Sequence, residues 1–171
     1  MRRILSAWLI CLLCISLFAC ADDEASEVRI PVKFYYHNIN IAYNSEQGVI
    51  SAEIREAAEH QNDYEYLIQQ YLQGPTGDLH HSTFPAGTYL RQFTFEGTTV
   101  KIILSNEFST LTGHDLSIAC AALTKTLQEM TKATTIEISA SEGKLGSANT
   151  LTFGPDDFLY FDNSYSITDE S

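Results

Sequence analysis

Basic residues are scarce in this chain of 171 residues. Ten Lys and Arg face 22 Asp and Glu, which gives a formal net charge of −12. Arg2 and Arg3 are the only charged residues among the first 19, so without that segment 8 bases face 22 acids, a balance of −14. Nucleic-acid affinity depends on Lys and Arg that neutralise phosphates. The composition therefore argues against a nucleic-acid-binding protein.

Cysteine is also sparse, with four in the chain. Cys11 and Cys14 lie in an apolar N-terminal run and Cys20 directly follows it, which leaves Cys120 alone in the remainder. A single cysteine cannot form an intramolecular disulfide. Cys120 lies in an apolar helical stretch, where thiols are usually inert core residues. We expect no catalytic role for it.

The motifs of common enzyme classes are missing. The chain has no glycine-rich loop that would cradle a phosphate. Ser105-Asn106-Glu107 combines a hydroxyl with a carboxylate but lacks the Gly-Xaa-Ser-Xaa-Gly context of a hydrolase nucleophile. These residues follow a predicted strand, where capping the backbone is the expected role. The sequence predicts a protein that is not an enzyme and that uses no cofactor.

Patterns for metal binding are weak. His80-His81 lies in a polar loop near Asp78, but adjacent side chains diverge, and no other His or Cys stands at a spacing that completes a shell. Asp156-Asp157 offers hard oxygen ligands for a cation, yet the calcium-loop pattern is absent and Pro-Asp is common in turns. We expect no metal site.

The N-terminus has the three parts of an export signal: two arginines, an apolar run over residues 4–18 and the small residue Ala19. The run is short for a helix that must span roughly 30 Å of hydrocarbon. It ends in Leu17-Phe18-Ala19-Cys20 and is followed by an acidic segment. This resembles a bacterial lipobox, in which diacylglycerol alkylates the cysteine and the chain is cut just before it.

We therefore expect residues 1–19 to be a lipoprotein signal peptide and residues 20–27 to be an acidic linker with lipid on Cys20. The fatty acyl chains would anchor the protein to a membrane, because each buried methylene adds roughly 0.8 kcal/mol. The expected location is extracytoplasmic. The alternatives are an ordinary secretory signal and an uncleaved anchor.

Apolar periodicity predicts two helices after the linker. The first is capped by Asn62 or Asp63, carries one apolar stripe, and ends at Gly74-Pro75. The second follows Thr112 and Asp115, which resemble a capping box. Alternation and turn signals predict strands at 28–36, 39–43, 49–57, 88–95, 98–104 and 135–140, with a bulge or turn at 37–38.

This order predicts one small α+β domain over residues 28–145, with the elements β-β-α-β-β-α-β. Because each helix has one apolar stripe to bury, we expect both helices to pack on one face of a mixed β-sheet. Residues 146–171 read as an aromatic C-terminal extension that packs on the domain and ends in an acidic tail. Its aromatic side chains are alternatively interface anchors: Phe153, Phe158, Tyr160, Phe161 and Tyr165.

Four short motifs resemble those of a known family. They are Tyr71-Leu72-Gln73-Gly74-Pro75, Phe84-Pro85-Ala86-Gly87-Thr88, Leu104-Ser105-Asn106-Glu107-Phe108 and Ala122-Leu123-Thr124-Lys125-Thr126-Leu127. In this order and spacing they resemble the sporulation and spore-germination (GerMN) domain, over about residues 32–143. The resemblance implies an exported or lipid-anchored bacterial envelope protein with a fold similar to the ring-building motif of sporulation channel complexes. It carries over no catalytic residue.

The resemblance also implies a link to sporulation or germination, although the protein that names the family has two copies in tandem and this chain has one. We expect a membrane-tethered, extracytoplasmic module that binds another envelope protein or copies of itself. The sequence does not fix the binding residues. The alternative is a lipoprotein that binds a small ligand or a cell-wall polymer in a cleft lined by Tyr and Phe. An enzyme is the third reading.

Overall fold

The computed structural model describes residues 31–39, 48–57 and 60–158. Its elements are β1 (Pro31–Asn38), β2 (Ile50–Glu56), α2 (Tyr64–Leu72), β3 (His80–His81), β4 (Leu90–Glu96), β5 (Thr99–Leu104), the 3-10 helix η2 (Asn106–Thr110), α3 (Gly113–Thr131), β6 (Thr135–Ala140) and β7 (Thr150–Phe153). The α+β class and the two helices are as predicted. No helix within the described ranges is long and apolar enough to cross a membrane.

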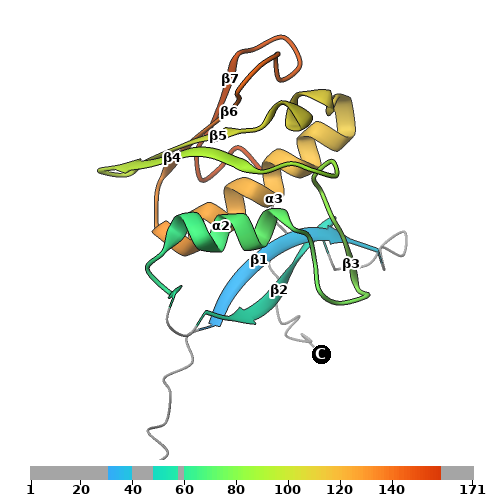
Figure 1. Cartoon of the computed structure of the whole chain (residues 1–171), viewed down its shortest axis with the longest axis vertical. Helices are drawn as coiled ribbons and strands as arrows, with labels where there is room; N and C mark the ends of the chain where they lie inside the picture. The colour runs from blue at the N-terminus through green and yellow to red at the C-terminus, as the bar shows by residue number, and fades with distance from the viewer. Residues whose placement is uncertain (1–30, 40–47, 58–59, 159–171) are drawn as a thin grey trace, which may run out of the picture.

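The strands divide into two sheets. Strands β2-β1-β3 form an antiparallel sheet, and β4-β5-β6-β7 form a mixed sheet in which only β5 and β6 are parallel. Figure 1 shows α2 and α3 as a layer between the two sheets. The prediction had both helices on one face of one mixed sheet. The structure contains that mixed sheet and adds a second sheet on the other side of the helices.

Helix α3 is buried on two sides because its second side is built from small residues. Leu116, Leu123 and Leu127 form part of the core cluster. Ala122 and Thr126 are also fully buried, and Thr126 Oγ1 accepts a 2.9 Å hydrogen bond from the backbone N–H of Tyr35 in β1. Because each helix shows one stripe of large apolar residues, the sequence predicted a single sheet, and the second sheet on this side of α3 was not predicted.

Strand β1 continues through the predicted break at residues 37–38. His37 pairs with Ile50 of β2 and with His81 of β3, so both neighbours hold this end of the strand in place. Strand β3 has only two residues and was expected to be loop. Pairing with β1 holds these two residues in an extended conformation. A segment of two residues is too short to show the alternation that predicts a strand. Residues 40–43 of the predicted second segment lie outside the described residues.

One helix cap is as predicted and the other is not. Asp63 caps α2, because its Oδ1 accepts a 3.0 Å hydrogen bond from Tyr66 N. Thr112 takes the N-cap position of α3, but its side chain makes no capping hydrogen bond. Gly113 follows with a φ of +54°. This left-handed residue is the first of α3, and the expected capping box does not form.

Three of the four family-like motifs each place one aromatic ring in the core. Tyr71 stacks on Phe34 of β1 at 5.3 Å between ring centroids and meets Phe84 edge-on at 5.0 Å. Phe84 in turn lies 6.2 Å from Phe108. All four rings are buried. Aromatic pairs at these separations stabilise a core beyond their buried area, so these motifs are explained first by packing.

Candidate functional site

Strand β2 turns its polar side chains toward the inside of the domain. Ser51, Glu53 and Arg55 stand opposite Tyr36, Phe34 and Val32 of β1, and therefore share the face that lies toward α2. The intervening residues Ile50, Ala52 and Ile54 point to the other face, and Ile54 is 64% exposed. A strand that buries its polar residues must satisfy them with specific partners.

Arg55 provides most of these partnerships. Its guanidinium donates to Glu53 Oε1 at 2.6 Å and to the Tyr36 hydroxyl at 3.1 Å. It also donates to the carbonyl oxygens of Gly74 at 2.7 Å and Gln70 at 3.3 Å, at the end of α2. Burial raises the pKa of Tyr36, and the nearby Arg55 charge offsets only part of this effect. The Tyr36 hydroxyl therefore stays protonated and donates to Tyr71 O at 2.8 Å.

Glu53 fixes the loop that follows α2. It accepts hydrogen bonds from Thr76 N at 3.0 Å, Thr76 Oγ1 at 3.0 Å and Gly77 N at 3.2 Å. Burial raises the pKa of the Glu53 carboxyl, but the hydrogen bonds from Arg55, Gly77 and Thr76 outweigh it and hold the pKa below its usual range. Together, Glu53 and Arg55 clamp the Gly74-Pro75 turn against β2.

Ser51, His80 and Glu53 lie in the order of a serine nucleophile, a histidine and a carboxylate. A 2.9 Å hydrogen bond joins Ser51 Oγ and His80 Nε2, while His80 Nδ1 lies 3.9 Å from Glu53 Oε2. A base must be oriented by a hydrogen-bonded carboxylate in such an arrangement. Here the carboxylate is already engaged by Thr76 and Gly77. The geometry supports a structural role, which is to hold β3 against β2.

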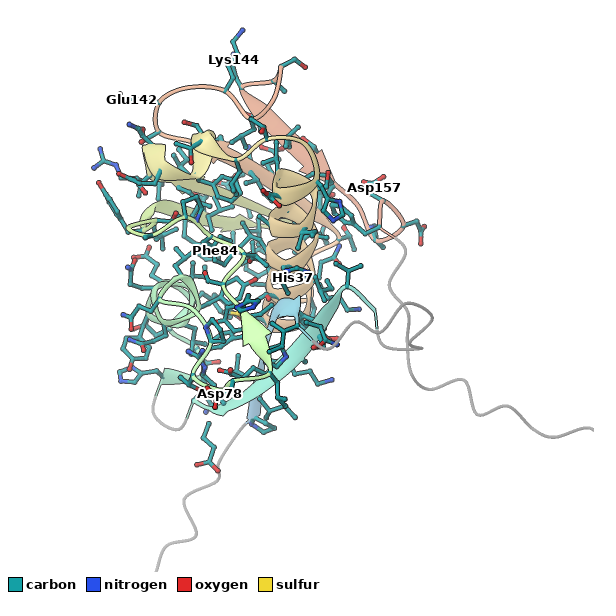
Figure 2. All side chains as sticks on the ribbon, turned by 90° about the vertical axis from the view of Figure 1, so that its right-hand side faces the viewer. His37, Asp78, Phe84, Glu142, Lys144 and Asp157 are labelled. Atoms are coloured by element: carbon teal, nitrogen blue, oxygen red, sulfur yellow. The ribbon has the colours of Figure 1, made fainter. Side chains whose placement is uncertain are left out.

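His37 lines a hollow of about 240 Å³ between β1, the loop after β3 and the start of α3. Phe84, Asp115 and Ile118 are among the other lining residues, and Figure 2 shows His37 and Phe84 close together. Burial lowers the pKa of His37, and the neighbouring His81 and His114 lower it further, against the opposing effect of Asp115. His37 is therefore set to be neutral at neutral pH.

The residues considered as metal ligands have separate environments. His80 bonds to Ser51, whereas His81 stands opposite His37. Figure 2 shows Asp78 and Asp157 far apart. Asp157 Oδ2 accepts a hydrogen bond from Gly154 N, which is turn chemistry. Within the described part of the chain, no group of three or more His, Cys, Asp and Glu is arranged to hold a metal ion.

The remaining sequence candidates also have structural partners. Ser105 Oγ accepts a 3.1 Å hydrogen bond from Tyr89 N and so fastens the end of β5 to the start of β4. Cys120 is buried, and burial raises the pKa of its thiol to about 12, so it stays protonated. Phe153 of β7 packs on Phe158 at 4.8 Å. Tyr160, Phe161, Tyr165 and the predicted lipid site Cys20 lie outside the described residues.

Three residues with exposed aliphatic side chains occupy neighbouring backbone positions at one end of the three-stranded sheet. Val49 O accepts a 2.9 Å hydrogen bond from Asn38 N, and Leu79 O accepts a 3.3 Å bond from Ile39 N, so these segments are neighbours. Ile39 is 41% exposed, Val49 42% and Leu79 61%. We call Ile39, Val49 and Leu79 the aliphatic cluster. Contiguous exposed apolar surface is typical of protein-binding sites.

Sequence reasoning missed both the Arg55–Glu53 clamp and the aliphatic cluster. The signal for the clamp is present in the sequence 50–55, where apolar and polar residues alternate. Alternation alone does not say which face is buried, and the usual assumption places the isoleucines inside. The aliphatic cluster depends on the pairing of β1 with β3, which the sequence did not predict.

The chain was compared with known protein families and structures. The family model Germane, described as "Sporulation and spore germination", matches residues 33–146. A comparison with curated proteins finds no match.

Three solved structures resemble the chain. The tandem GerMN domains of the sporulation protein GerM from Bacillus subtilis are 14% identical with a TM-score of 0.53, and the match covers 76% of this chain and 45% of that one. The first GerMN domain of GerM is 14% identical with a TM-score of 0.47, and the match covers 70% and 91%. A Clostridium perfringens protein described as a candidate lipoprotein is 22% identical with a TM-score of 0.45, and the match covers 75% and 89%.

Proposed function

The chain belongs to the Germane family of sporulation and spore germination, and from that premise we propose that it is a membrane-tethered, extracytoplasmic lipoprotein whose domain binds another envelope protein. Lipid on Cys20 holds the protein at the membrane. The acidic linker gives the domain reach, and the aliphatic cluster supplies the contact. The chain spans less than half of the tandem GerM structure, so its own partner and its process, sporulation or germination, are part of the proposal.

The aliphatic cluster is the observation that carries the protein-binding role. Leu79 is more than half exposed, and Ile39 and Val49 are more than a third exposed. Burying apolar surface of this kind contributes about 25 cal/mol per Å². Aliphatic side chains offer no hydrogen bonds to a polar ligand, so a protein surface with its own apolar groups is the matching partner.

A non-catalytic role agrees with how the reactive side chains are used. The Cys120 thiol is buried and protonated, and Glu53 is engaged by backbone donors rather than by His80. If Ser51 were nevertheless a nucleophile, a fluorophosphonate probe would label the native protein and Ser51→Ala would abolish the label. We expect no labelling above that of the Ser51→Ala variant.

The membrane tether is tested by cell fractionation. The full chain should partition with membranes and incorporate labelled palmitate, whereas Cys20→Ala should lose the label and leave the membrane fraction. Cys120→Ala is the matched control, and it should keep both the label and the attachment. Membrane attachment of Cys20→Ala would contradict lipid anchoring at that residue.

Partner binding is tested by capture of the lipidated, tagged protein from cross-linked cells. We expect a specific envelope protein, or ladders of the protein itself, to be recovered with the unaltered chain and lost with Leu79→Ser. Ile54→Ser is the matched control, because Ile54 is as exposed as Leu79 but lies outside the aliphatic cluster. Equal recovery with both variants would place the contact elsewhere.

A further inference from the structure

Two adjoining hollows lie where the start of α2 meets the β4–β5 hairpin and the start of β1. The first, of about 510 Å³, is lined by residues 62–65 and by Phe93. The second, of about 290 Å³, reaches from residues 31–33 of β1 to the end of α3. Asn62 and Tyr64 line both. We treat the two as one shallow, open surface feature, the Tyr64 groove.

Aromatic rings form one wall of the Tyr64 groove. The Tyr64 ring lies 5.8 Å from the Phe93 ring and 6.2 Å from the Phe95 ring, measured between centroids. Phe95 is 38% exposed although it lies on the side of the hairpin that faces α2. The hairpin therefore presents ring surface to solvent beside the groove. Such surface stacks on the C–H faces of sugar rings as well as on apolar side chains.

Amide side chains accompany these rings. Gln61 and Asn62 both line the groove, and an amide both donates and accepts hydrogen bonds. Sugar hydroxyls and acetamido groups also do both. The combination of ring faces and amides distinguishes this groove from the aliphatic cluster, which offers no polar group from its side chains.

The charges around the groove do not favour a ligand of either sign. Asp63 is engaged in capping α2, and Glu129 stands within 4 Å of Lys125 and Lys132. Glu65 and Lys33 add one charge of each sign at the two ends. The chain after residue 19 carries −14, so a polyanion would be repelled as a whole. The near balance of the charges that line the groove matches an uncharged ligand.

From these observations we propose that the Tyr64 groove binds an uncharged chain of N-acetylated amino sugars. With lipid on Cys20, the ten residues 21–30 span at most about 35 Å when fully extended. Pro31, which lines the groove, would then stay in the layer directly outside the bilayer, where a wall glycan can be reached. This inference goes beyond the protein-binding proposal. Figure 1 shows the β4–β5 tip and β3 on opposite sides of the molecule, so the proposed glycan site and the aliphatic cluster are separate surfaces.

The test is an NMR titration of the isotope-labelled full chain in detergent with the tetramer of N-acetylglucosamine. We expect saturable shifts confined to the backbone of residues 31–33, 61–65 and 93–95. Phe93→Ala and Asn62→Ala, which remove lining side chains, should each weaken binding about tenfold, which equals about 1.4 kcal/mol. Tyr66→Ala is the matched control, because Tyr66 is an exposed tyrosine of α2 that does not line the groove, and it should bind normally.

Several outcomes would overturn the glycan site. They are the absence of saturable shifts, shifts centred elsewhere, unchanged affinity in both groove variants, and preferential binding of poly(glycerol phosphate) or of an extended peptide in the groove. Leu79→Ser should bind the tetramer normally. This keeps failure of the glycan site distinct from failure of the protein-binding proposal.

Discussion

The guanidinium of Arg55 donates a 2.7 Å hydrogen bond to the carbonyl oxygen of Gly74. A residue of β2 thereby satisfies a backbone acceptor just beyond the end of α2, and the same guanidinium also reaches Gln70 O in the last turn. Carbonyls at a helix end have no partner within the helix. Arg55 supplies that partner from outside, which ties the first sheet to the helix layer.

Replacing Arg55 should destabilise the domain strongly. Arg55→Met keeps much of the apolar stem but leaves Gln70 O and Gly74 O without this donor and removes the positive charge beside Glu53. Loss of one member of such a mostly buried network costs about 2–4 kcal/mol. Urea unfolding measures the change. Arg91→Met is the control, because Arg91 is exposed and its side chain donates a 3.3 Å hydrogen bond to the Tyr89 hydroxyl. It should change stability by less than about 0.5 kcal/mol.

Acid should weaken the fold through His37. The folded-state pKa of His37 is lowered below 6.5 by burial and by His81 and His114, against Asp115. As the pH falls, the unfolded chain therefore binds the proton before the folded chain does. The contribution of His37 to the free energy of unfolding is present above pH 6.5 and is lost as the pH falls through 6.5 toward the lower folded-state pKa. In urea unfolding at a series of pH values, the free energy of unfolding of His37→Gln should depend less steeply on pH than that of the unaltered chain.

The same pKa can be read directly by an NMR titration of the His37 ring. His81→Gln should raise the pKa of His37, because it removes a like charge from the cross-strand position. A His37 pKa at or above 6.5 in the folded protein would refute this account of the hollow.

Gly143 should be far less replaceable than Gly97, although both have positive φ values of +83° and +62°. A Cβ at Gly143 would lie 2.7 Å from Ser109 Oγ and 3.0 Å from Ser109 Cβ, whereas nothing lies within 4 Å of one at Gly97. We expect Gly97→Ala to cost about 1 kcal/mol from backbone strain alone. Gly143→Ala should cost about 1–3 kcal/mol more because of the overlap.

Thermal or urea unfolding of the two alanine variants measures this difference. Ser109→Ala combined with Gly143→Ala should recover part of the additional loss, because the shorter side chain removes the closest atom. Equal costs at the two glycines would show that the loop around Gly143 relaxes freely.

Thiol labelling tests the burial of Cys120. Its pKa of about 12 and its position in the core predict that a disulfide reagent reacts with it only after unfolding. The labelling rate in the native protein should therefore follow the opening of the fold and rise with denaturant. Fast labelling in buffer would contradict the packing of α3 against the core.

The two helices could be predicted because their apolar stripes recur at helical spacing and Gly74-Pro75 ends the first one. The hairpin of β4 and β5 was equally clear from Glu96-Gly97, where β4 ends at Glu96 and β5 begins at Thr99. These features depend on neighbours within a few residues in the chain. For such elements, local chemistry is sufficient.

The division into two sheets could not be predicted in the same way. It depends on Ala122 and Thr126, which allow α3 to lie against β1, and on His81 pairing with His37 across 44 positions of the chain. The Arg55–Gly74 bond is likewise invisible to periodicity. Long-range pairings of single residues decided both the arrangement of the layers and the candidate surfaces.

Site-specific photo-cross-linking in cells tests the central claim most directly. A photoreactive residue is placed at Leu79 in one strain and at Ile54 in another, each in the full chain with Cys20 intact. We predict a discrete adduct with an envelope protein, or with a second copy, from position 79 and not from position 54. The same adduct from both positions, or none from position 79, would contradict a protein-binding role for the aliphatic cluster.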